Sequence, residues 1–266
     1  MHRSVRQLAE RLSRDVVFHR RLPECFGGAS VFVSPAAGLR FWRPHIEKCD
    51  PRLLNLAADL VKPGAVVWDV GANVGLFSFA AAGLAGPSGR VLAIEPDQWL
   101  VSLLRRSVRA NTKRTARVDI LPVAISDSLD VKQFHIAQRS RSANYLDGYG
   151  LTDAGGSREM HLVPTATLDW LLERFPAPAV LKIDVEGSEV EVLKGAQRLL
   201  SEAQPVLLCE VGEQNSDAVA EYLRPHGYLL FDADLAKAER RPLARACWST
   251  LALPKTSCPD YSPLSR

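Results

Sequence analysis

Short apolar runs alternate with amphipathic stretches along most of this chain, and no other feature restricts its possible folds as strongly. Apolar runs typical of buried strands cover residues 66–70, 90–94, 118–123, 180–184 and 206–210. Stretches with apolar residues at helical spacing cover residues 74–83, 97–111, 167–175, 188–201 and 216–226. Such alternation is typical of βαβ units, in which right-handed crossovers build a parallel sheet. We therefore predict a doubly wound α/β fold with a mainly parallel sheet.

Residues 1–50 precede this alternation, and we expect them to form an extension that could cap the substrate side of a domain spanning 51–266. The spacing of Val5, Leu8, Leu12 and Val16 predicts a solvated amphipathic helix, with a membrane-surface helix as the alternative. Apolar runs on either side of a Pro- and Gly-containing turn predict a β-hairpin, with arms at 30–33 and 39–42. Asp50 and Pro51 are typical of a helix start.

The stretch from 131 to 165 interrupts the alternation. Residues 131–136 are typical of a strand, and 248–253 of a final one, whereas 138–157 are rich in Ser, Gly, Asn and Arg. We interpret 138–157 as a long loop, and long ordered loops in compact domains are often functional. Asn144 and Tyr145 within it are reasonable substrate contacts.

Composition excludes several other classes of protein. Of the 266 residues, 47% are hydrophobic and 24% charged, and the net charge of +3 does not call for a nucleic-acid partner. The five cysteines are dispersed, so zinc is not expected, and reduced thiols favour a cytoplasmic location. The N-terminus lacks a signal-type apolar core, and the longest apolar stretch, 74–86, is too short for an integral membrane segment.

The strongest motif joins the first predicted strand to its helix, where residues 66–75 read VVWDVGANVG. In doubly wound sheets ligands bind at this end of the strands, and Gly71 can take backbone angles that a Cβ forbids. From Gly71 the next glycine is Gly75, and Asn73 stands where a dinucleotide fingerprint needs glycine, which disfavours a nicotinamide-binding turn. We interpret Asp69 as the partner of a ligand's cationic amino group; the alternative is that it caps the turn.

Acidic or polar residues also follow the next two predicted strands. Glu95, followed by Pro96, ends the second strand, where nucleotide-binding folds place an acid on ribose hydroxyls. Ser126 and Asp127 follow the third strand. They could accept a hydrogen bond from an adenine amino group, or they could form an ordinary turn.

The fourth strand end reads LKIDVEGSE from Leu181. Lys182 and Asp184 alternate onto one face of the strand, and Glu186 lies in the turn that follows. Charges at the end of a central strand are costly to bury unless they are paired or used. The stretch therefore predicts a site, with a structural Lys–Asp pair as the alternative. His45 and His161 are further candidates for a general base.

These motifs occur in a recognisable combination: DVGANVG at 69–75, IEPD at 94–97, KIDVEGSE at 182–189 and LCE at 208–210. The combination resembles the FkbM-type methyltransferases. The resemblance implies a class I methyltransferase, Rossmann-like fold and an S-adenosyl-L-methionine cofactor. It also implies O-methylation of a small-molecule, glycan or glycolipid acceptor.

Together these interpretations define a predicted site. The predicted cofactor contacts are Asp69, Gly71, Asn73, Gly75, Glu95, Pro96, Ser126 and Asp127. The predicted catalytic residues are Asp184, Glu186 and Lys182, with either acid taking or orienting the hydroxyl proton. A divalent metal on these acids is a variant that we do not expect, because no third ligand is evident. A nicotinamide-binding protein and a non-catalytic Rossmann-like module are the alternatives.

Overall fold

The computed structural model describes residues 15–111, 114–150 and 155–258. The helix expected over residues 5–16 lies almost entirely outside these ranges. Within them, no helix is both long enough and apolar enough to cross a bilayer.

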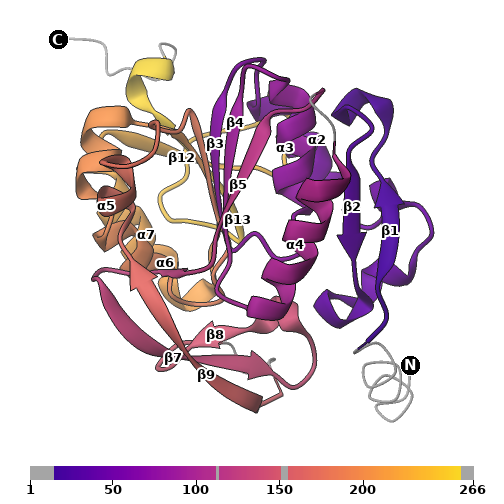
Figure 1. Ribbon diagram of the computed structural model, residues 1–266. Coiled ribbons are helices and arrows are strands. Elements are labelled where there is room, and N and C mark those ends of the chain that lie inside the picture. The colour runs from indigo at the N-terminus through magenta and orange to yellow at the C-terminus, as the bar shows by residue number, and fades with distance from the viewer. Residues whose placement is uncertain (1–14, 112–113, 151–154, 259–266) are drawn as a thin grey trace, which may run out of the picture.

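A seven-stranded sheet forms the centre of the fold, in the order β12-β13-β11-β10-β3-β4-β5 (Figure 1). Its strands are β3 (Val66–Val70), β4 (Arg90–Ile94), β5 (Arg117–Leu121), β10 (Val180–Ile183), β11 (Val206–Glu210), β12 (Tyr228–Asp232) and β13 (Ser249–Pro254). Only β13 runs against its neighbours, pairing antiparallel with both β11 and β12. The prediction of a mainly parallel, Rossmann-like sheet is therefore confirmed, although β12 was not predicted.

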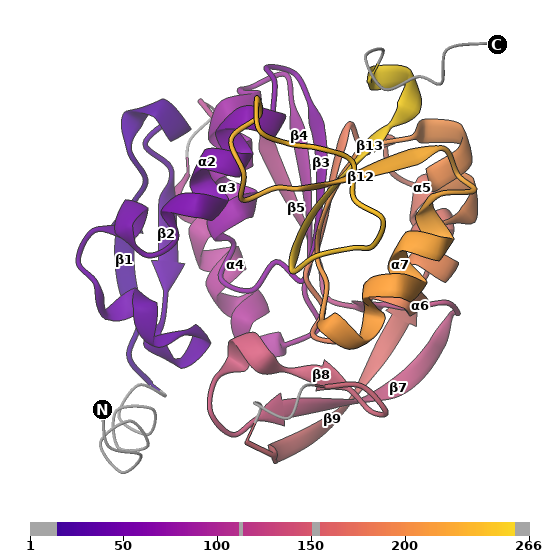
Figure 2. The ribbon, with the colours of Figure 1, turned by 180° about the vertical axis from the view of Figure 1, so that it is seen from behind.

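Helices cover both faces of this sheet, as a doubly wound fold requires (Figures 1 and 2). One face carries α2 (Pro51–Leu60), α3 (Leu76–Ala85) and α4 (Gln98–Ala110); the other carries α5 (Leu168–Leu172), α6 (Glu189–Lys194) and α7 (Ser216–Leu223). Capping side chains explain where several of these helices begin. Asp50 accepts the Leu53 N–H, Asp97 the Trp99 N–H and Thr167 the Trp170 N–H.

The sixth helix is shorter than the stretch of 188–201 that the sequence predicts. It ends at Lys194, and a separate π-helical turn covers Leu199–Ala203. The chain at Gly195 packs so closely that a Cβ there would lie 2.3 Å from the Ser126 carbonyl oxygen. Packing against the segment after β5 thus accompanies the break in the helix.

The N-terminal hairpin exists, but the predicted pairing of its arms was wrong. β2 (Ser30–Val33) pairs antiparallel with β1 (Phe18–Arg21), and residues Leu39–Trp42 form a 3-10 helix. The reason is local, because the Ser34 hydroxyl accepts the Ala36 N–H and Pro35 starts a 3-10 turn, so the chain does not return as a strand. Apolar side chains of the hairpin belong to the same hydrophobic core as α2, α3 and α4.

A smaller sheet lies below the carboxyl ends of the central strands, in the order β6-β9-β7-β8. Its strands are β6 (Ala124–Ile125), β7 (Asp130–Ala137), β8 (Tyr145–Leu146) and β9 (Ser157–Ala166). The segment 138–157, predicted as loop, therefore contains the short strand β8. Phe134, Ile136, Leu146 and Val163 form the buried face of this sheet.

Candidate active site

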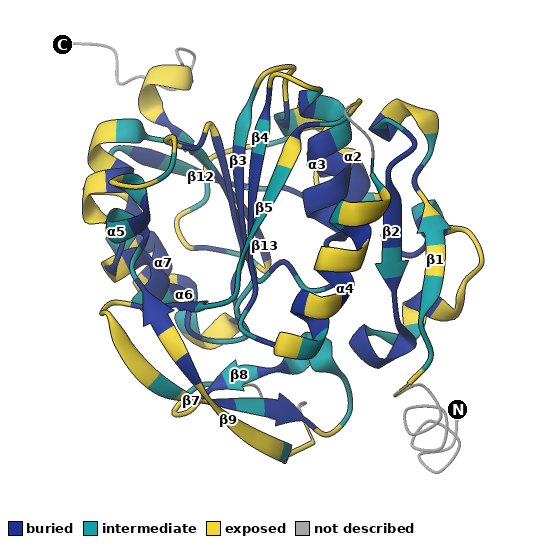
Figure 3. Ribbon diagram, in the orientation of Figure 1, coloured by how far each residue is buried: buried dark blue, intermediate teal, exposed yellow. Residues whose placement is uncertain are grey.

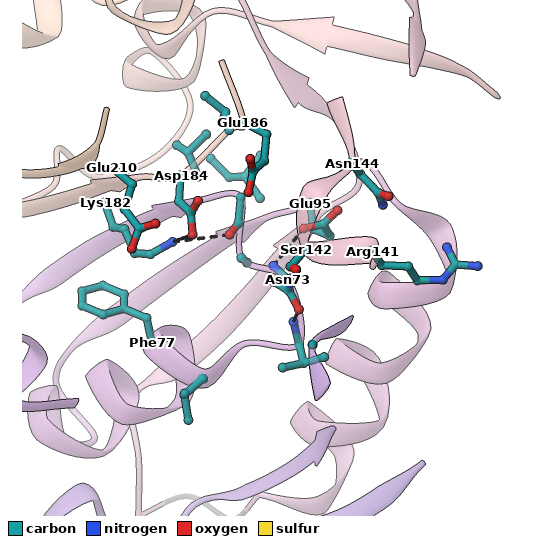
Figure 4. Close-up of a pocket in the computed structure, with 18 of the residues that line it drawn as sticks. Asn73, Phe77, Glu95, Arg141, Ser142, Asn144, Lys182, Asp184, Glu186 and Glu210 are labelled. Carbon is teal, nitrogen blue, oxygen red and sulfur yellow. Dashed lines mark hydrogen bonds and ion pairs between the residues drawn. The ribbon is translucent and has the colours of Figure 1, made fainter. Parts of the chain in front are cut away.

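A cavity of about 440 Å³ opens at the carboxyl ends of β3, β4, β10 and β11. Strand order reverses between β3 and β10, and this switch point is where open α/β sheets bind ligands. The walls come from the β3 turn, the ends of β4, β10 and β11, the start of α2, the 3-10 turn at 38–41, and residues 141–146. Figure 4 shows 18 of the lining residues around this space and labels ten of them.

The β3 turn forms one wall, and Gly71 and Asn73 both line the cavity. Gly71 has φ of 75°, and a Cβ there would lie 1.8 Å from the Asp184 carbonyl oxygen. A glycine is therefore required at position 71, because the backbone at the end of β10 approaches it closely. The amides of Gly71 and Ala72 both donate to the Ile94 carbonyl oxygen, at 3.0 Å. These contacts hold the turn against β4 and β10 without the help of a ligand.

Asp69 and Gly75 from the same motif do not line the cavity. The Asp69 carboxylate is fully buried; it accepts the Ser78 hydroxyl at 2.5 Å and lies 3.2 Å from Lys182 Nζ. A Cβ on Gly75 would lie 2.6 Å from a Leu104 methyl carbon. Both residues thus hold α3, α4 and β10 together behind the wall.

Glu95 lines the cavity from the end of β4, and Pro96 does so beside it. The Glu95 side chain accepts the Asn73 N–H at 2.8 Å and the Asp97 N–H at 2.9 Å. Burial, reinforced by the neighbouring Asp97 carboxylate, raises the pKa of Glu95 to about 8. A buried carboxyl with this pKa, and with backbone amides as donors, is suited to receive hydroxyl donors from a ligand.

Ser126 and Asp127 lie outside the cavity lining, which instead includes Val123, Ala124 and Ile125. Lys132 Nζ donates to the Ser126 hydroxyl at 2.7 Å and to Asp127 at 3.3 Å. Their side chains therefore belong to a turn network at the base of β7, and backbone and apolar groups of this segment face the cavity.

Lys182 and Asp184 line the cavity from β10 (Figure 4). Lys182 Nζ lies 3.2 Å from Asp69 and from Asp184, and it is 3.4 Å from the Gly71 carbonyl oxygen. Burial acts to lower the pKa of Lys182, but Asp184 and Asp69 outweigh it and hold that pKa above its usual range. Lys182 therefore stays cationic and cannot accept a proton. Its role is to hold Asp184 in place.

Glu186 follows in a strained turn and also faces the cavity. Its φ is 50°, in the left-handed region, and Gly187 follows with φ of 106°. The buried Glu189 carboxylate fixes this turn by accepting the Gly187 N–H at 2.7 Å and the Asn215 amide at 2.6 Å. Burial, then the Asp184 and Glu210 carboxylates, raises the pKa of Glu186 to about 8.

Glu210 and Arg52 join the site, although neither is among the predicted site residues. Glu210 ends β11 beside Asp184, which follows the paired strand β10, and Arg52 Nη2 lies 2.8 Å from the Glu210 carboxylate. Arg52 also pairs with Asp234 at 2.9 Å, which ties α2 to the sheet. Burial and Asp184 raise the pKa of Glu210 to about 7 despite Lys182 and Arg52. The rule that singled out Glu95, an acid at a strand end, also points to Glu210.

The 138–147 segment closes the cavity beside the turn that follows β4. Asp97 accepts hydrogen bonds from Arg141 and, at 2.9 Å, from the Asn144 amide. Both residues line the cavity, as does Ser142 between them. Asn144 was predicted as a substrate contact, but its side chain is engaged by Asp97 and by the Ala137 N–H. Tyr145 stacks on His135 and does not line the cavity.

The two histidines considered as bases lie on the surface, away from the lining. His45 is 3.6 Å from Glu47, and His161 is 3.3 Å from Glu159. Among the residues that the structure describes, no group of three or more His, Cys, Asp or Glu side chains is arranged to hold a metal ion. The acids around Lys182 are instead arranged about an ammonium group.

Comparison with known proteins identifies the family. Residues 69–230 match the Methyltransferase FkbM domain. The chain is 31% identical to 31-O-demethyl-FK506 methyltransferase FkbM of Streptomyces tacrolimicus, and it spans 93% of that protein. It is 27% identical to hexuronic acid methyltransferase AglP of Haloferax volcanii and 28% to AMB antimetabolite synthetase AmbE of Pseudomonas aeruginosa. The chain spans 64% of AglP and 10% of AmbE, so it corresponds to only part of these two relatives.

A solved structure, methyltransferase FkbM from Methylobacillus flagellatus, is 17% identical with a TM-score of 0.45, covering 82% of this chain and 58% of that one. The family match covers more than half of the present chain and includes the β3 turn, Glu95, and the β10 turn described above. The chain therefore belongs to the FkbM methyltransferase family.

Proposed function

We propose that this enzyme methylates a hydroxyl of a small-molecule, sugar or glycan acceptor, and that Glu186 takes the hydroxyl proton. The observation that carries the proposal is the Glu186 carboxyl, which faces the cavity with a pKa of about 8. Within the described part of the chain, no side chain or backbone amide donates a hydrogen bond to the Glu186 carboxyl, whereas Glu95 and Glu189 each accept two. A general base is most effective when its pKa lies near the working pH.

The names of two relatives support a hydroxyl acceptor. One is a hexuronic acid methyltransferase, and the other acts on 31-O-demethyl-FK506. A hexuronic acid and a demethylated ether position both offer hydroxyl groups, although they differ greatly in size. We infer the shared chemistry, methylation at oxygen, for the present chain.

The residues at the end of β4 fit the cofactor. Glu95 faces the cavity, and the backbone amides of Asn73 and Asp97 already hold its carboxyl in place. Two adjacent hydroxyls of a ribose would each donate to this carboxyl, and Gly71 and Asn73 would border the rest of the cofactor. Bound S-adenosylmethionine supplies a methyl group that its sulfonium already activates.

Replacing Glu95 with Gln is expected to weaken binding of S-adenosylhomocysteine by about 1.5–3 kcal/mol, the range for hydrogen bonds to a charged group. The pKa of about 8 means that most Glu95 is protonated at neutral pH in the free protein. Hydroxyl donors favour the ionised form, so wild-type binding should release a proton and tighten as pH rises towards 8. Titration calorimetry in buffers of different ionisation enthalpy measures both effects. Equal proton release by the Gln variant would contradict this assignment.

The rest of the site positions and encloses the acceptor. Lys182 fixes Asp184, which lies beside Glu186 and can orient the acceptor hydroxyl. The 138–147 segment, held by Asp97, covers the cavity and helps to exclude water. Glu186 removes the hydroxyl proton as the oxygen bonds to the methyl carbon; the bond between that methyl carbon and sulfur breaks, and S-adenosylhomocysteine leaves. Such a reaction depends mainly on orientation and on one positioned base.

The acceptor class can be tested directly. The enzyme is incubated with isotopically labelled S-adenosylmethionine and a panel of uronic acids, neutral glycosides, polyketide alcohols and matched amines. We expect the label in a methyl ether, identified by mass spectrometry and by its carbon chemical shift. Transfer confined to nitrogen or carbon nucleophiles would overturn the proposal while leaving the methyltransferase assignment intact.

A further inference from the structure

One side of the molecule carries a cationic surface that neither the fold nor the cavity uses. It consists of Arg105, Arg106 and Arg109 of α4 together with His19 and Arg21 of β1. We call it the cationic face. All five residues are exposed. Helix α4 lies beside the β1–β2 hairpin (Figures 1 and 3).

The two elements are fixed to each other, so the face is one surface. The Phe32 N–H of β2 donates to the Ser107 hydroxyl of α4 at 2.8 Å, and the Asn111 amide bonds to the backbone of Ser30. The Arg106 guanidinium lies 4.3 Å from the centre of the Phe32 ring, and the His19 ring stacks on the same phenyl group at 4.8 Å. These contacts bring side chains of α4 and β1 together around Phe32.

The arginines of this face differ from nearby arginines in their ion pairs. Nearby Arg90 and Arg117 both pair with Asp119. By contrast, none of the four arginines of the cationic face forms an ion pair with any residue that the structure describes. The adjoining N-terminal sequence has the same character, because residues 1–21 contain six arginines and only two acids. Such a surface favours an extended anionic partner.

We propose that the cationic face docks the enzyme on a membrane surface rich in anionic phospholipid. Guanidinium groups bind phosphate oxygens through paired N–H donors, and several of them in one plane match a layer of headgroups. A nucleic acid is the less suitable partner, since base recognition uses aromatic rings as stacking platforms. The aromatic ring at the centre of this face, Phe32, is already engaged by His19 and Arg106.

The test is co-sedimentation of the full chain with vesicles of phosphatidylcholine, with and without phosphatidylglycerol, at low and high salt. We expect binding only to the anionic vesicles and its loss at high salt. The triple variant R105Q/R106Q/R109Q should lower the partition coefficient by about 100-fold, since each basic residue near an anionic surface contributes about 1 kcal/mol. The matched control R224Q/K237Q/R241Q removes three exposed charges elsewhere and should bind as the wild type does.

The affinity of each variant for S-adenosylhomocysteine shows whether the protein remains folded. This control does not require the acceptor to be known. Unchanged vesicle binding by the α4 variant would overturn the proposal, as would equal binding to pure phosphatidylcholine. Tighter, α4-dependent binding of RNA than of anionic vesicles would also overturn it and would assign the face to nucleic acid.

Discussion

Replacing Glu186 with Gln is expected to lower kcat for methyl transfer by about 10²–10⁴-fold, the usual contribution of a positioned general base. Gln has nearly the same shape, so the turn held by Glu189 and Asn215 should persist. The cofactor's Kd should change by no more than a few-fold, because Glu95 on the opposite wall is untouched. Steady-state kinetics at saturating cofactor and calorimetric titration give the two quantities. Glu221→Gln, an identical change on the exposed surface of α7, is the control.

The pH profile separates a base from a residue that only shapes the cavity. A base must be deprotonated to act, and burial beside Asp184 and Glu210 raises the pKa of Glu186 to about 8. Wild-type kcat at saturating cofactor should therefore increase as pH rises through about 8 and then level off. The Gln variant should lose this step. A variant that turns over slowly but keeps the same pH step would assign the titration to another group, such as Glu210.

Much of the fold could be predicted because local signals agree with the tertiary structure. Strands β3, β4 and β11 have the predicted bounds, since each is a short apolar run between turn residues and is almost fully buried. β9 was missed for the opposite reason. Its apolar residues Met160 and Leu162 are exposed, whereas the buried Val163 and Thr165 lie on the face that carries Glu159 and His161. The alternation in the sequence therefore does not indicate which face of β9 is buried.

The site was predictable only where it lies at strand ends. Glu95, Asp184 and Glu186 follow buried strands, and parallel strands bring such positions to one edge of the sheet. Arg52 and Arg141 come from segments outside the alternation, and packing rather than sequence spacing brings them to the cavity. Asp69 is the opposite case: it is an acid in the last turn-side positions of a strand, but it contacts Ser78 and Lys182 and does not face the cavity. A sequence pattern identifies the edge of the sheet, and side-chain packing decides which residues face a ligand.

Replacing Gly71 with Ala is expected to be among the most destabilising single substitutions in the chain. Two costs combine at this position. An L-residue at φ of 75° costs about 1–2 kcal/mol. In addition, the new Cβ would lie 1.8 Å from the Asp184 carbonyl oxygen, which belongs to backbone and cannot rotate away. The strands β3 and β10 would have to separate at their ends, adding about 1–3 kcal/mol or more.

Gly64→Ala is the matched control for the second cost, because Gly64 also has positive φ, at 78°, in a turn closed by the Ala65 N–H and the Lys62 carbonyl oxygen. An added Cβ there would meet only the Ser88 hydroxyl oxygen, at an ordinary contact distance of 3.6 Å. Urea unfolding should therefore show a smaller loss for Gly64→Ala and a much larger one for Gly71→Ala. The separation of β3 and β10 would also displace the amides of Gly71 and Ala72 from Ile94, and with them the Asn73 N–H that holds Glu95. Cofactor affinity should fall in the Gly71 variant and not in the Gly64 variant. Equal stabilities would mean that the β3 turn can move away from β10, and the rigid wall inferred for the cofactor would be wrong.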